Sequence, residues 1–239
     1  MDSKILSISR YQVLSGSALK LIACLSMLAD HLAKCYLCRF AWFRETWFTV
    51  LGRSVSAQEL MIAFGRFAFP LFVFLLVVGF ENTRNRTRYG ISLFILALLS
   101  ELPFNLMIGG VLRFPVQNVI FTLLLGFLAM WSLSALKQRP VLSFVALIAL
   151  FMVSKYLNAD YGAAGFVFIL LVYGLRREKI LRCIAAPFLL ASKMKVMMAL
   201  MLTLLYNGQR GFIKTPFLKY CFYAFYPVHM LVIYWISRC

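Results

Sequence analysis

The sequence predicts an all-α membrane protein, a polytopic bundle of transmembrane helices that forms a single domain over residues 1–239. Hydrophobic residues make up 63% of the chain and charged residues 14%, whereas soluble domains are about half apolar and a quarter charged. The apolar residues come in runs that are separated by basic residues, Gly and Pro, which is the pattern of successive membrane spans. Lipid is therefore the expected solvent for most of the chain.

The net charge of +17 comes from 25 Lys and Arg residues against 8 Asp and Glu residues. The basic residues lie mainly between the apolar runs, as juxtamembrane anchors do. Because no soluble module is left to present a basic face, nucleic acid is excluded as a partner, and membrane lipid is the expected surrounding. Cys35 and Cys38 form a C-x-x-C without a second ligand pair, so they are interpreted as small membrane-compatible residues and no metal is expected. The alternative is a redox or metal role for this pair.

About nine spans (8–10) are expected from the apolar runs and the breakers between them. They are Ala18–Leu37, Leu60–Phe80, Tyr89–Ile108, Val116–Leu136, Val141–Lys155, Gly162–Leu175, Ile180–Ser192, Lys195–Tyr206 and Lys219–Ser237. The fifth to eighth runs are shorter than the ~20 residues of a straight crossing, so they extend into their connectors, tilt little in a thinned region, or include a re-entrant pair. Lys and Arg are more frequent in the loops that share a side with the N-terminus, which is therefore expected in the cytoplasm.

The first run contains the dipeptide Asp30-His31 among apolar residues. An ionisable group at bilayer depth costs at least ~2.5–3.5 kcal/mol on insertion scales, so it usually faces a cavity or a partner. Neighbouring helical residues point about 100° apart, so Asp30 is not expected to orient the His31 ring. We expect one of the two to contact a substrate and the other to pair elsewhere. The alternative is a buried polar pair that only fixes helix packing.

Arg66 lies at the outer start of the second run, four residues before Pro70. Its guanidinium fork suits a carboxylate or a phosphate. Pro70 is expected to free a backbone carbonyl within an apolar helix, which then needs a local partner. The alternative for Arg66 is a side chain that merely reaches from the interface into water.

Three further polar residues stand at the ends of the next two runs. Glu101 and Asn105 end the third run, and Asn118 opens the fourth, ahead of a long apolar stretch. All three are compatible with ordinary helix termini or caps. They are also candidates for the wall of a polar cavity.

The later runs add two more candidate positions. Asp160 and Tyr161 open the sixth run, where Asp160 fits a helix N-cap. His229 lies near the middle of the last run, two residues after Pro227, and this spacing predicts a broken helix that lines a cavity. The alternative is a core histidine that bonds a neighbouring hydroxyl group.

With the N-terminus inside, most of these polar residues map to the outer half of the membrane, and His229 maps to its middle. Independent helix caps would not be expected to collect on one side. A polar cavity that opens outward is therefore expected, with two histidines available as acid or base near neutral pH.

These stretches resemble the TraX family through five motifs that follow one another in family order along essentially the whole chain. The motifs are Leu-Lys-x-Ile-Ala with Met-Leu-x-Asp30-His31, Gly65-Arg66-x-Ala68-Phe69-Pro70-Leu71-Phe72, Asn118-x-x-Phe121, Tyr161-Gly162-x-x-Gly165 and Phe-Tyr-x-x-Tyr-Pro-x-His229. Each motif is weak alone, whereas five in sequence are specific.

The resemblance implies a membrane-embedded acetyltransferase of the bacterial inner membrane. Such an enzyme transfers an acetyl group from acetyl-CoA to the N-terminal amine of a pilin-type subunit. A more distant similarity to multipass acyltransferases leaves a surface glycan or a lipid as the alternative acceptor. The alternatives of another class are a small-solute transporter, which usually shows a two-fold repeat, and a non-enzymatic pilus-assembly factor, which would tolerate Gln at both histidines.

Transfer of an acetyl group to an amine needs a base and donors for the developing oxyanion. We assign His31 as general base or transient acyl carrier, and Asp30 as the group that stabilises its protonated form or binds the amine. The third catalytic candidate is His229, and the candidates for binding substrate or acyl donor are Arg66, Asn118, Asp160, Tyr161 and Glu101. Since acetyl-CoA is cytosolic, its pantetheine arm must reach through from the basic inner face, or an acyl-enzyme must carry the group across.

Overall fold

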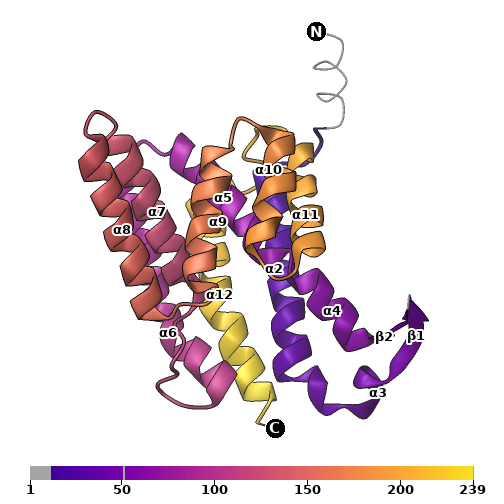
Figure 1. Cartoon of the computed structure of the whole chain (residues 1–239). Coiled ribbons are helices and arrows are strands. Elements are labelled where there is room, and N and C mark those ends of the chain that lie inside the picture. Colours follow the sequence, from indigo (N-terminus) through magenta and orange to yellow (C-terminus); the bar gives the residue numbers. More distant parts are fainter. Residues whose placement is uncertain (1–11, 51, 239) are drawn as a thin grey trace, which may run out of the picture. The chain divides into compact units, whose positions relative to one another are not determined.

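The computed structural model describes residues 12–50 and 52–238, which form α-helices and one short β-hairpin (Figure 1). The α-helices are α2 (Gly16–Cys35), α3 (Ala41–Arg44), α4 (Ala57–Gly65), α5 (Ala68–Asn82), α6 (Arg86–Gly109), α7 (Val119–Ala135), α8 (Pro140–Leu157), α9 (Gly162–Gly174), α10 (Lys179–Ala185), α11 (Lys193–Leu202) and α12 (Pro216–Ile236). Three 3-10 turns, η1 (Leu37–Arg39), η2 (Ala186–Leu189) and η3 (Thr203–Leu205), follow α2, α10 and α11. Every run that was predicted to be a span contains helix.

The hairpin is the one departure from the predicted all-α class within the described residues. Strands β1 (Thr46–Val50) and β2 (Arg53–Ser56) pair antiparallel, with Phe48 opposite Val55. The β-branched and aromatic residues of β1 favour a strand over a helix, and Gly52 near the turn takes a positive φ of 77°, which glycine adopts without strain.

Within residues 12–50 and 52–238, four helical stretches are long and apolar enough to cross a membrane, so the chain is a multi-pass membrane protein. They are Gly16–Arg39, Ala57–Asn82, Arg86–Gly109 and Pro140–Leu157, and α7 and α9 are shorter apolar helices. By contrast, α10 has 7 residues and α11 has 10. At a rise of ~1.5 Å per residue neither crosses a ~30 Å hydrocarbon core alone, so the runs Ile180–Ser192 and Lys195–Tyr206 are not straight crossings.

The predicted span Leu60–Phe80 consists of two helices, because α4 ends at Gly65 and α5 begins at Ala68. Pro70 therefore lies in the first turn of α5, where its missing N–H has no intrahelical acceptor to lose. The expectation that Pro70 frees a carbonyl inside a helix is wrong for this reason.

The chain divides into two compact units. Unit 1 consists of Met1–Phe72 and Met194–Cys239, and unit 2 consists of Val73–Lys193. The single domain over residues 1–239 stays a prediction.

In unit 1, α2 packs against α4 and α12. The connection from η3 to α12 closes over the first turn of α2, where the N–H groups of Gly16 and Ser17 donate to the carbonyls of Gln209 and Arg210 at 2.8 Å each. These bonds satisfy N–H groups that a helix start otherwise leaves without a partner. Unit 1 thus joins helices from both ends of the chain.

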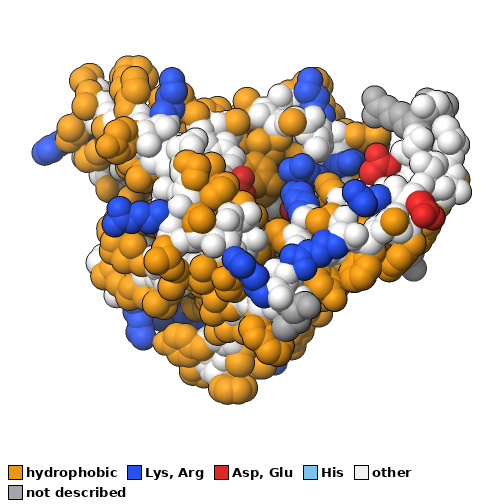
Figure 2. Space-filling view, turned by 90° about the horizontal axis from the view of Figure 1, so that it is seen from below, with side chains coloured by type: hydrophobic (Ala, Val, Ile, Leu, Met, Phe, Trp, Pro, Cys, Tyr) orange, Lys and Arg blue, Asp and Glu red, His pale blue; other side chains and the backbone are white. Residues whose placement is uncertain are grey.

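In unit 2, α7 is the central helix and packs against α6, α8 and α9. A Cβ atom on Gly126 of α7 would lie 2.5 Å from Cδ1 of Ile169 on α9, so the glycine permits the close approach of these helices. Large apolar side chains of α8, such as Val141 and Phe144, are exposed. Figure 2 shows how widely hydrophobic side chains cover the visible surface, as lipid contact requires.

Candidate functional site

The two histidines of the chain meet in unit 1. Nδ1 of His31 on α2 lies 2.8 Å from Nε2 of His229 on α12. The two rings are parallel within 1°, with their centroids 5.1 Å apart. His229 is 6% exposed, so the pair lies largely out of contact with solvent. Sequence reasoning named both residues but did not pair them.

The hydrogen bonds define which ring nitrogens carry protons when both rings are neutral. Nδ1 of His229 lies 2.7 Å from the carbonyl oxygen of Phe225, one helical turn earlier. A carbonyl only accepts, so this Nδ1 is protonated and Nε2 of His229 is an acceptor. Nδ1 of His31 therefore donates to His229, and Nε2 of His31 has no proton. A bare imidazole nitrogen is the form that acts as base or nucleophile.

Helix α12 is continuous through Pro227, so the predicted break in the last span is wrong. The ring of His229 is held by its neighbours on the same helix. It stacks on Phe225 with centroids 4.9 Å apart and touches Tyr226. These contacts, and not a broken helix, fix the orientation of His229.

Asp30 points away from its neighbour His31, as the 100° helical step requires. Its Oδ2 pairs with Nζ of Lys34, one turn along α2. Its Oδ1 is buried without a hydrogen-bond partner. The carboxyl group packs against Gly65 of α4, where a Cβ atom would lie 2.6 Å from Oδ1. Asp30 is therefore placed by an ion pair and a glycine contact, not by the imidazole.

Arg66 caps the C-terminal end of α4, and its N–H donates to the carbonyl of Ile62 at 3.2 Å. Its side chain is half-buried and makes no ion pair within the described part of the chain. It follows Gly65, so it lies one residue from the contact with Asp30. Unit 1 thus brings together the Asp30-His31 dipeptide, the Gly65-Arg66 segment and His229.

Glu101 and Asn118 meet in unit 2. Oε2 of Glu101 accepts from Nδ2 of Asn118 at 2.6 Å and from the Asn118 backbone N–H at 3.2 Å. Nδ2 also donates to the carbonyl of Ala97, and Oδ1 accepts from the N–H of Ile120. Asn118 is the N-cap of α7, and every polar group of its side chain is engaged. Asn118 therefore fixes the position of the Glu101 carboxylate through these hydrogen bonds.

Asp160 and Tyr161 lie next to the same end of α7. The hydroxyl group of Thr122 donates to the Asp160 carbonyl at 2.5 Å, and the Asp160 N–H donates to the carbonyl of Gln117 at 2.9 Å. The N-cap of α9 is Tyr161, with a positive φ of 65° and no side-chain cap. The expectation that Asp160 is this cap is wrong by one residue, because its Oδ1 accepts from the Tyr161 N–H instead.

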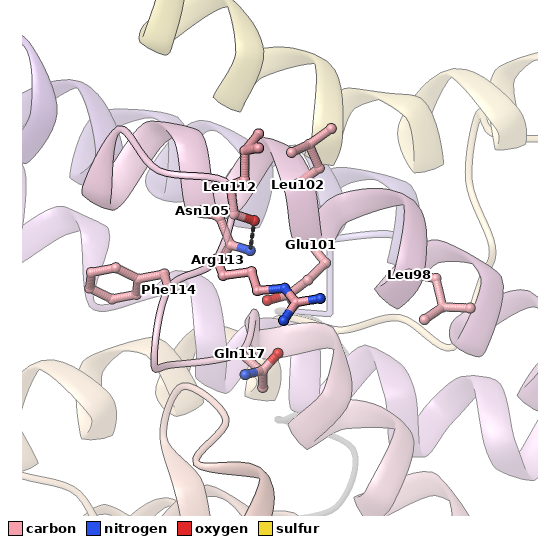
Figure 3. A pocket seen from close by; sticks show the side chains of 8 residues that line it. All are labelled: Leu98, Glu101, Leu102, Asn105, Leu112, Arg113, Phe114 and Gln117. Atoms are coloured by element: carbon pink, nitrogen blue, oxygen red, sulfur yellow. Dashed lines mark hydrogen bonds between the residues drawn. The ribbon is translucent and has the colours of Figure 1, made fainter.

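A pocket of about 440 Å³ lies beside Glu101 in unit 2 (Figure 3). Its polar lining comes from Glu101, Asn105, Arg113 and Gln117, and its apolar lining from Leu98, Leu102, Leu112 and Phe114. Asn105 turns its amide toward the Leu112 carbonyl, to which Nδ2 donates at 3.1 Å. Arg113 was not among the predicted residues. The sequence signal for Arg113 was its position in a loop between two predicted spans, and most basic residues of the chain share such a position.

A helical membrane protein with a hydrogen-bonded histidine pair is the class that this fold and site define. The chain belongs to the TraX family, because the family model described as TraX protein matches residues 15–237. This confirms the resemblance drawn from the five motifs.

One curated relative supports the same grouping. "Probable fimbrial assembly protein FimC, serogroup H1" of Dichelobacter nodosus is 28% identical to this chain over an alignment of 248 residues. The alignment covers 92% of this chain and 94% of the relative. No solved structure matches the chain.

Proposed function

We propose that this chain is a membrane-embedded acetyltransferase that moves the acetyl group of acetyl-CoA to the N-terminal amine of a pilin-type subunit. The observation that carries the proposal is the His31–His229 hydrogen bond, which leaves Nε2 of His31 without a proton. Membership of the TraX family supports it, and the relative is named as a fimbrial assembly protein.

In the proposed reaction the acceptor amine attacks the thioester carbonyl, a C–N bond forms and the C–S bond breaks. Nε2 of His31 takes the proton that the amine loses and returns it to the departing thiolate. While His31 is protonated, its Nδ1–H bond to His229 becomes charge-assisted and therefore stronger. His229 acts as a positioning residue, anchored through Nδ1 to the Phe225 carbonyl. A transient acetyl group on Nε2 of His31 is compatible with the same geometry.

The other candidate residues are proposed to bind the substrate or the acyl donor. Arg66, next to the Asp30 contact, is proposed to bind the oxyanion or a donor phosphate. Glu101, whose carboxylate Asn118 holds, is proposed to bind substrate or acyl donor. Asp160 and Tyr161 are proposed to shape the same end of unit 2.

The proposed location is the bacterial inner membrane, with the N-terminus in the cytoplasm and about nine spans. The contacts of α2 and α12 support an odd count. Lys20 near the start of α2 approaches Phe222 near the start of α12, and His31 further along approaches His229. The two helices are therefore parallel, as the first and the last of an odd number of spans would be; this fits nine spans, or seven if the α10 and α11 runs form a re-entrant pair.

The test uses inverted membrane vesicles with radiolabelled acetyl-CoA and a synthetic peptide that carries a pilin-type N-terminal sequence. His31→Ala and His229→Ala are compared with wild type and with Asn82→Ala, an exposed control, at equal membrane levels. Label on the peptide that needs wild-type protein and is lost in His31→Ala supports the proposal. Near-normal transfer by His31→Ala overturns it.

The name of the relative favours one competing function, a non-enzymatic fimbrial assembly factor. A histidine pair that only fixes the packing of α2 on α12 would tolerate Gln at either position. Full fimbrial assembly with both His31→Gln and His229→Gln, and no acetylated subunit in either strain, would favour this second function.

A further inference from the structure

A cluster of basic side chains lies near the start of α2 and α12 in unit 1. Nζ of Lys20 lies 5.3 Å from the ring centroid of Phe222 and 5.0 Å from that of Tyr223. Nζ of Lys219 lies 5.6 Å from the same Tyr223 ring. Arg210 is held near the first turn of α2, because the backbone N–H and the hydroxyl group of Ser17 both donate to its carbonyl, at 2.8 and 2.6 Å. We call Lys20, Lys219 and Arg210 the basic cluster.

The basic cluster is electrostatically unbalanced. None of its three side chains makes an ion pair within the described residues, and two ammonium groups share one aromatic ring. Cation–π contacts with Tyr223 and Phe222 stabilise each lysine, but the like charges repel one another. Lys20 and Lys219 are half-buried, so water screens this repulsion only in part. A multiply charged anion would remove it.

The basic cluster is in register with the histidine pair. His31 follows Lys20 by eleven residues, which brings it back to within about 20° of the same face of α2 and about 16 Å further along. On α12, His229 follows Phe222 by seven residues, again on one face. An extended pantetheine arm spans a comparable distance. A donor with phosphates at one end and a thioester at the other matches this spacing.

We propose that Lys20, Lys219 and Arg210 bind the nucleotide phosphates of the acyl donor, so that its thioester extends along α2 and α12 toward His31. This inference rests on the proposed function. The phosphates take the place of the missing carboxylates, and Tyr223 and Phe222 form the floor beneath them. The cluster lies on the side of the membrane that carries the N-terminus, where a cytosolic donor is available. It gives the donor a route to a site deep in the membrane without a second carrier.

The first experiment measures equilibrium binding of radiolabelled coenzyme A to the purified full chain in detergent, without any acceptor. Lys20→Gln and Lys219→Gln are each expected to weaken binding by roughly tenfold, since each removes a charge-assisted contact. Lys20→Arg, which keeps the charge, is expected to bind nearly as wild type. Lys137→Gln, an exposed lysine of unit 2, is the matched control. Unchanged affinity in both Gln variants overturns the proposal.

The second experiment compares acetyl-CoA with S-acetylpantetheine, which has the same thioester but no nucleotide phosphates. The Gln variants are expected to raise the KM for acetyl-CoA by roughly tenfold and to leave the KM for S-acetylpantetheine unchanged. An equal rise for both donors overturns the proposal. If the cluster binds coenzyme A but no acetyl transfer is found in any protein, the proposed function fails and this binding site stands.

A third experiment tests whether the basic cluster binds the acyl donor or phospholipid headgroups. Nanodiscs of phosphatidylcholine with or without phosphatidylglycerol present the competing phosphate source. If the Gln variants lose phosphatidylglycerol binding and keep wild-type affinity for coenzyme A, the cluster is a lipid site and the proposal is overturned.

Discussion

Nδ2 of Asn118 lies 2.6 Å from Oε2 of Glu101, and the backbone N–H of Asn118 donates to the same oxygen at 3.2 Å. One residue thus both caps α7 and fixes a carboxylate on α6. The other carboxylate oxygen, Oε1, is buried without a partner. The stability of unit 2 and the orientation of Glu101 therefore depend on one buried amide.

Asn118→Ala is expected to lower the free energy of unfolding by about 1–3 kcal/mol, because it removes the cap and leaves Glu101 without its donor. Unfolding by sodium dodecyl sulfate in mixed micelles measures this. Asn82→Ala, an exposed amide that bonds the Val78 carbonyl, is the control and should change stability by less than about 0.5 kcal/mol. The double variant with Glu101→Gln should lose less than the sum of the single variants; simple additivity would contradict the coupling.

Gly65→Ala tests the contact between α4 and Asp30. Alanine in place of a helical glycine normally favours a helix by up to ~1 kcal/mol. At Gly65 the added Cβ would lie 2.6 Å from Oδ1 of Asp30, so we expect a destabilisation of about 1–3 kcal/mol. Gly174→Ala is the matched control, since its Cβ would meet no atom within 4 Å. Equal thermal stability of the two variants would show that α2 and α4 do not approach so closely.

The helices could be predicted from the sequence because lipid imposes one simple rule, a run of apolar residues between polar breakers. This rule does not predict helices or strands that are too short to span the membrane. The β1–β2 hairpin lies in a loop for which hydropathy predicts no regular element. The break between α4 and α5, at Gly65–Ala68, occurs within one apolar run. The α10 and α11 helices are too short to cross, and only their backbone geometry shows where they end.

The candidate site was predicted as separate residues, and the structure supplies the pairs. Lys34 lies four residues after Asp30, a spacing that already favours an ion pair, so this contact was within reach. His31 and His229 are separated by 198 positions, and nothing local indicates that they meet. The cap assignment failed at Asp160 because Tyr161 adopts a left-handed φ, which propensity does not predict for tyrosine.

The tautomers of the histidine pair can be measured directly, since the chain has 2 histidines. In protein labelled with ¹⁵N-histidine, both rings should show a protonated Nδ1 and a bare Nε2 at neutral pH. The reason is the sequence of bonds from His31 Nδ1 to His229 Nε2 and from His229 Nδ1 to the Phe225 carbonyl. In the expected spectrum the pyrrole-type resonance of each ring is assigned to Nδ1 and the pyridine-type resonance to Nε2.

His229→Gln assigns the remaining signals to His31 and removes the imidazole acceptor of its Nδ1–H. In this variant His31 should populate both neutral tautomers. At a pH low enough to protonate both rings, no bare nitrogen is left to accept, and the N–H···N bond should be lost. A proton on Nε2 of His31 in the wild-type protein at neutral pH would contradict the assignment, and with it the role of that nitrogen as base.

Ser17→Ala tests whether the loop before α12 positions the basic cluster. Ser17 is 2% exposed, and its hydroxyl group donates to the Arg210 carbonyl at 2.6 Å and accepts from the Ile213 N–H at 2.9 Å. Its loss leaves the buried Ile213 N–H without this acceptor and the Arg210 carbonyl with one donor fewer, so we expect a destabilisation of about 1–3 kcal/mol.

The same variant should weaken coenzyme A binding, because Arg210 is then held less firmly beside Lys20, although no charge has been removed. Ser92→Ala is the control, since its exposed hydroxyl bonds only the Arg88 carbonyl on its own helix. If Ser17→Ala lowers stability and leaves coenzyme A affinity at the wild-type value, Arg210 does not need its loop for binding. Lys20 and Lys219, which stand on helices, would then carry the recognition of the phosphates by themselves.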